Sequence, residues 1–75
     1  MNRIRRDKIV KVIQVIGSAR DSLEDIINEE QEYYDNIPEN LLGGERAESS
    51  EEAIGIMESI FESLNEVIDE LGDIV

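Results

Sequence analysis

The sequence contains no cysteine, histidine or tryptophan, and its only proline is Pro38. Without cysteine the 75-residue chain has no disulfides, and without cysteine or histidine it lacks the thiolate and imidazole ligands of typical zinc sites. A domain of this size buries only a modest fraction of its surface. With disulfides and such metal sites excluded, we expect self-association to supply the additional stability.

Long apolar runs are also missing. No stretch approaches the roughly 20 apolar residues that a membrane-spanning helix requires. Charged and polar residues, among them Lys8, Lys11 and Gln14, interrupt the apolar positions near the N-terminus, so no signal-peptide core forms there. The lack of cysteine agrees with a reducing compartment. We therefore expect an intracellular, cytoplasmic protein with no membrane partner.

Charge is strongly one-sided, with 19 acidic and 7 basic side chains and a formal net charge of −12. Direct binding to nucleic acid is therefore unfavourable. Residues 1–11 hold five of the basic side chains and one acidic side chain, a local charge of +4. In an antiparallel hairpin this basic start would lie beside Asp69, Glu70 and Asp73, an arrangement that favours one orientation of the two helices.

Apolar residues recur at alternating three- and four-residue steps in the first half of the chain, which is typical of an amphipathic helix. The predicted stripe consists of Ile9, Val12, Ile16, Ala19, Leu23, Ile26, Glu30, Tyr33 and Ile37, and it is widened by Val10, Ile13, Ile27 and Tyr34. Such a wide face is typical of a helix in a bundle. We predict a helix over residues 7–36.

The second half of the chain repeats this pattern. Its predicted stripe consists of Ala53, Met57, Ile60, Leu64, Val67, Leu71 and Ile74, flanked by Ile54, Phe61, Ile68 and Val75. Ser49, three residues before Glu52, would form a capping box at the helix start, and Ser50 is an equally good cap. We predict a helix over residues 50–74.

The connector over residues 37–49 contains Pro38, which disfavours helical geometry at the preceding residue, and the pair Gly43-Gly44. A short helical turn over 38–42 would end at the glycines, which accept backbone angles that other residues avoid. The chain is thus predicted to be a single all-α domain, an antiparallel two-helix hairpin. Each apolar face is wider than one helix can cover, so we expect two hairpins to form a homodimeric four-helix bundle, or a higher oligomer.

Three residues depart from the helical pattern. Glu30 interrupts the first stripe, and we expect it either to lie at the bundle edge or to set the helix register by pairing with a group such as Arg20 or Arg46. The alternatives are a buried acid and a residue that lines a pocket between bundle halves. Gly17 and Gly55 each cost about 1 kcal/mol of helix propensity relative to alanine, which favours a role in close helix approach.

No catalytic motif is present, and with no histidine or cysteine we expect neither enzymatic activity, nor a bound cofactor, nor a metal site. The candidate residues for binding a partner are Glu51, Glu58, Glu62, Glu66 and Glu70, which form an acidic row, and the aromatic pair Tyr33 and Tyr34. Rows of carboxylates either keep a bundle soluble or imitate a phosphate backbone. The tyrosines either pack in an interface or stack on a nucleobase.

The connector and its surroundings resemble a family of small acidic helical hairpins from bacteriophages and prophages. The shared pattern is a D-N-[IL]-P-E-x-L turn, here Asp35 to Leu41, then an E-R pair at Glu45-Arg46 and a helix opening E-E-A-I at residues 51–54. Where relatives carry serine before Glu45, this chain has Gly44. The resemblance implies a phage origin and a bacterial host cell, and it carries no activity to transfer.

Three hypotheses for function follow from the residues and this resemblance. The leading hypothesis is a protein that binds a host defence protein of the restriction or CRISPR type and imitates nucleic acid through its acidic surface. The alternative is a structural or adaptor oligomer that holds a host or phage protein by helix-in-groove contacts. A third hypothesis is an oligomeric sponge for a nucleotide signal.

Overall fold

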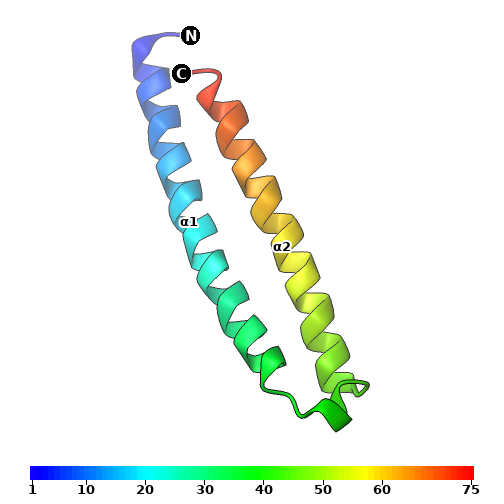
Figure 1. Cartoon of the computed structure of the whole chain (residues 1–75). Coiled ribbons are helices and arrows are strands. Elements are labelled where there is room, and N and C mark those ends of the chain that lie inside the picture. The colour runs from blue at the N-terminus through cyan, green and yellow to red at the C-terminus, as the bar shows by residue number, and fades with distance from the viewer.

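The computed structural model describes residues 1–75 as two long helices joined by a short connector (Figure 1). Helix α1 spans Arg3–Asp35, the 3-10 helix η1 spans Glu39–Leu41, and α2 spans Glu45–Gly72. The long helices run side by side in opposite directions, so both termini lie at one end of a rod 59 Å long and 15 × 12 Å across (Figure 1). The predicted all-α hairpin is confirmed. Neither helix has the length and apolarity to cross a membrane.

Asparagine side chains cap both ends of α1. The helix begins four residues earlier than predicted because Asn2 Oδ1 accepts a hydrogen bond from the backbone N–H of Arg5 at 2.9 Å. At the other end, Asn36 donates from its backbone N–H and from Nδ2 to the carbonyl of Glu32. Pro38 then has extended backbone angles, φ −56° and ψ 141°, and the chain turns away from the helix axis.

The start of α2 differs from the prediction. Gly44 is its N-cap, so α2 begins at Glu45, and the capping box predicted at Ser49 does not form. Neither Gly43 nor Gly44 has a positive φ, so the predicted reason for the glycines is wrong. Instead, a Cβ on Gly44 would lie 3.2 Å from the carbonyl oxygen of Leu41, which accepts the N–H of Gly44. This close approach explains the small residue at position 44.

The two helices meet along a heptad seam, in which contact residues alternate at steps of four and three. We define the seam by the residues whose side chains are buried or half-buried at this spacing: on the first arm Ile9, Ile13, Ile16, Arg20, Leu23, Ile27, Glu30, Tyr34 and Ile37, and on α2 Ala47, Ser50, Ile54, Met57, Phe61, Leu64, Ile68 and Leu71. Only Ala47, Ser50 and Ile54 are buried, and the other seam residues are half-buried. The intramolecular core is therefore narrow.

At every second position of the seam, the structure places the residue that follows the predicted one. Val12, Ala19, Ile26 and Tyr33 were assigned to the stripe of the first helix, but the structure places their neighbours Ile13, Arg20, Ile27 and Tyr34 in the seam. On α2, Ile54, Phe61 and Ile68 likewise take the positions assigned to Ala53, Ile60 and Val67. The displaced residues are all on one side of the seam.

The glycines inside the helices do not mediate close helix approach in this hairpin. A Cβ on Gly17 would make ordinary contact with Arg20 Nη2 at 3.9 Å, and a Cβ on Gly55 would meet nothing within 4 Å. The prediction for these two positions is therefore wrong within one chain.

Candidate functional site

One side of the hairpin is apolar along both helices. We call it the apolar flank and define it by the apolar residues one position before alternate seam residues, Val12, Ala19, Ile26 and Tyr33 on α1 and Ala53, Ile60 and Val67 on α2, together with Ile74 just beyond the end of α2. At the connector end of α2 the corresponding position is occupied by Arg46. Because the helices are antiparallel, residues that precede a seam position lie on the same side of both. Large members are widely exposed, with Ile26 at 50% and Ile60 at 46%. This flank is an unpartnered apolar surface.

The opposite side is acidic. We call it the acidic flank and define it by Asp21, Glu24, Asp35, Glu48, Glu51, Glu58, Glu62 and Asp69, all exposed. Each of these residues comes directly after a seam residue along the chain. Two grooves along the seam confirm the sidedness. One is lined by Tyr33 and Ala53 from the apolar flank, and the other by Gln31 and Glu51 on the acidic side.

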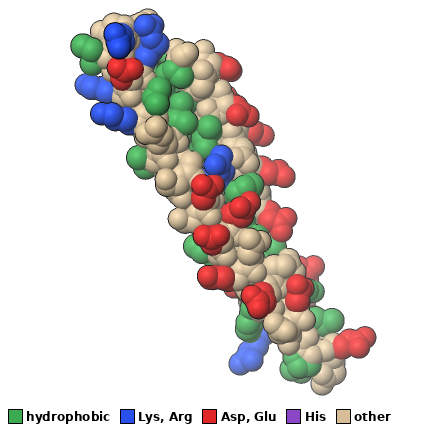
Figure 2. All heavy atoms as spheres, turned by 60° about the vertical axis from the view of Figure 1, so that its left-hand side comes forward, with side chains coloured by type: hydrophobic (Ala, Val, Ile, Leu, Met, Phe, Trp, Pro, Cys, Tyr) green, Lys and Arg blue, Asp and Glu red, His purple; other side chains and the backbone are tan.

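Basic and acidic side chains are also separated along the rod. Lysine and arginine gather at the end that carries both termini, whereas aspartate and glutamate cover most of the remaining length (Figure 2). Arg3, Arg5, Arg6, Lys8 and Lys11 make no ion pair with the nearby end of α2, because the molecule contains a single ion pair, Arg20 Nη2 to Asp21 Oδ1 at 3.1 Å. The positive charges at this end are therefore not neutralised by ion pairs within the chain.

Two polar contacts cross the seam and set its register. Ser50 Oγ, on a side chain only 4% exposed, donates to Glu30 Oε2 at 2.6 Å. Arg20 Nη1 donates to Asn65 Oδ1 at 3.1 Å, on the acidic side. Glu30 was predicted to pair with Arg20 or Arg46, but its partner is the hydroxyl of Ser50. Polar seam contacts of this kind specify one alignment of two helices.

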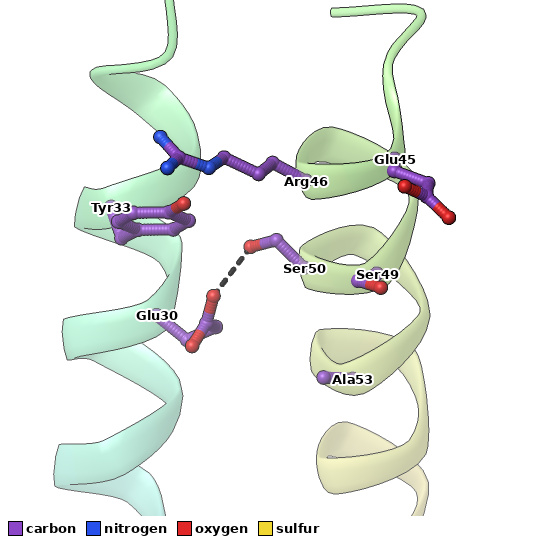
Figure 3. A pocket seen from close by; sticks show the side chains of 7 residues that line it. All are labelled: Glu30, Tyr33, Glu45, Arg46, Ser49, Ser50 and Ala53. Atoms are coloured by element: carbon purple, nitrogen blue, oxygen red, sulfur yellow. Dashed lines mark hydrogen bonds between the residues drawn. The ribbon is translucent and has the colours of Figure 1, made fainter.

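The Glu30–Ser50 contact forms the floor of an open groove of about 390 Å³. Arg46 extends from α2 toward Tyr33 on α1 above this contact, while Glu45 and Ser49 point away from α1 (Figure 3). The groove presents a carboxylate, a guanidinium and a phenol, and it is open to solvent. Because the groove lies beside the apolar flank, its polar side chains border that surface.

The acidic row that the sequence suggested does not form a straight stripe. Residues four apart on an α-helix are offset by about 40° around its axis. Glu58, Glu62, Glu66 and Glu70 are all exposed, but they wind from the acidic flank across the outer face of α2 toward the apolar flank. Glu51 and Glu58 remain on one line because they are seven residues apart. The acidic surface is thus carried by residues from both helices.

The structure separates the two tyrosines. Tyr33 is 47% exposed and lines the groove on the apolar flank, while Tyr34 is half-buried in the seam and lines the groove on the acidic side. Within one chain they cannot stack on the two faces of one base. Tyr33 is the member of the pair that is available to a partner.

Sequence reasoning missed Ser50 as a seam residue and assigned the apolar-flank residues to the core. The signal for the flank was present, because a heptad with three apolar positions is wider than a two-helix seam. Near the connector, Asp35 Oδ1 accepts a hydrogen bond from Gln31 Nε2, and Asn36 caps α1 by donating to the carbonyl of Glu32. No cluster of three or more His, Cys, Asp or Glu side chains could hold a metal ion.

Comparison of the chain with protein-family models, with curated proteins and with solved structures found no match.

Proposed function

We propose that this protein is a non-enzymatic, phage-encoded binding module of the bacterial cytoplasm, and that its acidic flank engages the basic surface of a host nucleic-acid-binding defence protein. The observation that supports this proposal is the unpaired state of the carboxylates. Of 19 acidic side chains only Asp21 forms an ion pair, and the acidic flank carries exposed carboxylates from both helices. An exposed surface of carboxylates, of which only Asp21 has a cation partner, attracts lysine- and arginine-rich grooves.

The charge density limits how much nucleic acid the flank can imitate. Duplex DNA as long as this 59 Å rod carries about 35 phosphate charges, roughly three times the net charge of −12. The flank can therefore replace the contacts of only a short stretch of duplex. We expect it to block a compact basic patch, such as one end of a binding groove.

The test is displacement of nucleic acid from a purified target that has been identified by affinity capture from the host. The protein should compete with a duplex for the target, and its affinity should fall at least tenfold between about 0.1 and 0.5 M salt, because exposed charges are screened. Binding that is insensitive to salt, or that leaves the duplex in place, would contradict the proposal.

A charge-matched pair of variants locates the surface. Glu51→Gln, Glu58→Gln and Glu62→Gln together neutralise three of the five carboxylates that α2 contributes to the acidic flank, and we expect at least a tenfold loss of affinity. Glu29→Gln, Glu32→Gln and Glu39→Gln remove the same charge outside that flank and should cost less than about threefold, because screened charges beyond the contact act weakly. Equal losses would show that net charge, and not the flank, attracts the target.

A second candidate function is supported by the apolar flank. Ile26, Ile60 and the other large residues of that flank form an exposed surface of the kind that marks helix-in-groove contacts. A structural or adaptor oligomer would use this surface and would respond to Ile60→Ala more than to neutralised carboxylates. Binding of the target that persists in high salt but is lost with Ile60→Ala would favour the adaptor.

A further inference from the structure

A single copy of the chain leaves too much surface exposed for a compact protein of its mass. Its accessible surface is 5750 Å², whereas a compact monomer of 8.5 kDa exposes about 4,700 Å². The excess of roughly 1,000 Å² is close to the 800 Å² or so that each partner buries in a standard stable interface. The apolar flank is the exposed surface that is apolar along both helices.

We propose that a second copy of this chain covers the apolar flank, and that the two hairpins pack face to face and antiparallel as a four-helix bundle. In this dimer α1 lies on the partner's α1 and α2 on the partner's α2, each pair antiparallel about one two-fold axis. The apolar-flank residues then become the third core position of every heptad, as in bundle helices.

The spacing of the apolar flank fits such an axis. A two-fold axis through Ala19 brings Val12 opposite the partner's Ile26 and Ala19 opposite the partner's Ala19, so the smallest side chain lies where the helices are closest. The seam register set by Glu30 and Ser50 puts Ala19 level with residues 61–64 of α2. The same axis therefore passes between Ile60 and Val67, and each of these faces the other in the partner.

Charge selects the antiparallel orientation over the parallel one. In the antiparallel dimer the basic end, with +4 over residues 1–11, meets the partner's acidic connector end, and Lys8 faces the partner's Glu29. A parallel dimer would instead bring two connector ends together, with the carboxylates of Glu29, Glu32 and Asp35 on each copy. The five basic residues within residues 1–11 have no ion-pair partner in their own chain, so they are free for this contact.

Light scattering on the full chain at tens of micromolar tests the dimer. The expected mass is twice the 8.5 kDa of one chain. The variant Ile26→Lys with Ile60→Lys should lose the dimer, while Glu24→Gln with Glu58→Gln, which changes the net charge by the same two units on the acidic flank, should retain it. A monomeric wild type, or a dimeric lysine variant, would overturn the proposal.

A further measurement covers the case in which the lysine variant does not fold. If dimerisation stabilises the fold, the melting temperature of the wild type must rise with chain concentration over a hundredfold range. A melting temperature independent of concentration would also overturn the proposal.

The orientation is tested by single cysteines, for which the cysteine-free chain is well suited. Under mild oxidation Ala19→Cys should form a disulfide-linked dimer in high yield, because the two-fold axis places this position beside itself. Ser18→Cys, one residue away on the outer face of α1, should not. A dimer in which neither or both positions cross-link would contradict the antiparallel arrangement.

Discussion

The two flanks of this hairpin are built on the same helices and border the same seam, but their side chains differ almost completely. On one flank large apolar residues such as Ile26 and Ile60 are about half exposed, and on the other Glu51 and Glu58 point into solvent without cation partners. The seam between them is narrow. The difference shows that two of the three apolar positions of each heptad are used within the chain, while the third remains exposed.

The largest effect is expected when two isoleucines of α2 are compared, one in the seam and one at an exposed position beside the apolar flank. Ile54 is 8% exposed and Ile56, beside the apolar flank, is 55% exposed. Ile54→Ala should lower the free energy of unfolding by about 2–4 kcal/mol through lost burial and an internal cavity. Ile56→Ala should cost less than about 1 kcal/mol. Urea unfolding at a fixed chain concentration measures both, and equal losses would mean that position 56 is buried as deeply as the seam.

The next largest effect is expected at Ser50 in the seam, and its neighbour Ser49 provides the comparison. Ser50→Ala should lower the free energy of unfolding by about 1–2 kcal/mol, because the seam carboxylate of Glu30 loses its hydrogen-bond donor. Ser49→Ala makes the same change in helix propensity at an exposed position that points away from α1, so it serves as the matched control. If thermal unfolding shows the same stability for both variants, the hydrogen bond contributes nothing to the stability of the hairpin.

A glycine tests whether the acidic side of the rod remains uncovered. Gly55 lies next to the acidic flank in the interior of α2, and a methyl group at this position would have nothing within 4 Å of it. Gly55→Ala should therefore raise the free energy of unfolding by about 1 kcal/mol, the difference in helix propensity. Chemical denaturation of the variant beside the wild type measures the change. A loss of stability would show that another chain packs closely against this side.

The smallest expected effect concerns repulsion among the carboxylates. Added salt should raise the melting temperature, because it screens the net charge of −12. Glu51→Gln with Glu58→Gln should add a few tenths of a kcal/mol at low salt and reduce this salt dependence, since exposed charge interactions are individually weak. Calorimetry at several salt concentrations measures both effects. A melting temperature that falls with salt would show that attractive ion pairs dominate.

The sequence predicted the hairpin and half of its seam correctly. Ile9, Ile16 and Leu23 on α1, and Met57 and Leu64 on α2, are half-buried in the seam as predicted. The other half was displaced by one residue, because adjacent pairs such as Ile26-Ile27 and Tyr33-Tyr34 satisfy either of two heptad alignments. Only the partner helix distinguishes them, through contacts such as that between Glu30 and Ser50.

The candidate site was predictable in its composition but not in its geometry. The carboxylates and tyrosines were identified, yet a row with a spacing of four winds around the helix, and adjacent tyrosines point to different sides. The start of α2 was also displaced, because the close approach of Gly44 to Leu41 set the helix boundary in place of the serines. Such a contact depends on the path of the connector.

By itself the sequence determined two amphipathic helices, the break at Pro38 and the separation of basic and acidic charge, because period, proline geometry and composition act locally along the chain. The tertiary structure alone decided which apolar residues are in the seam and which are on the flank. That choice depends on the register between the helices, which two polar contacts across the seam set, and no local property of either helix contains it.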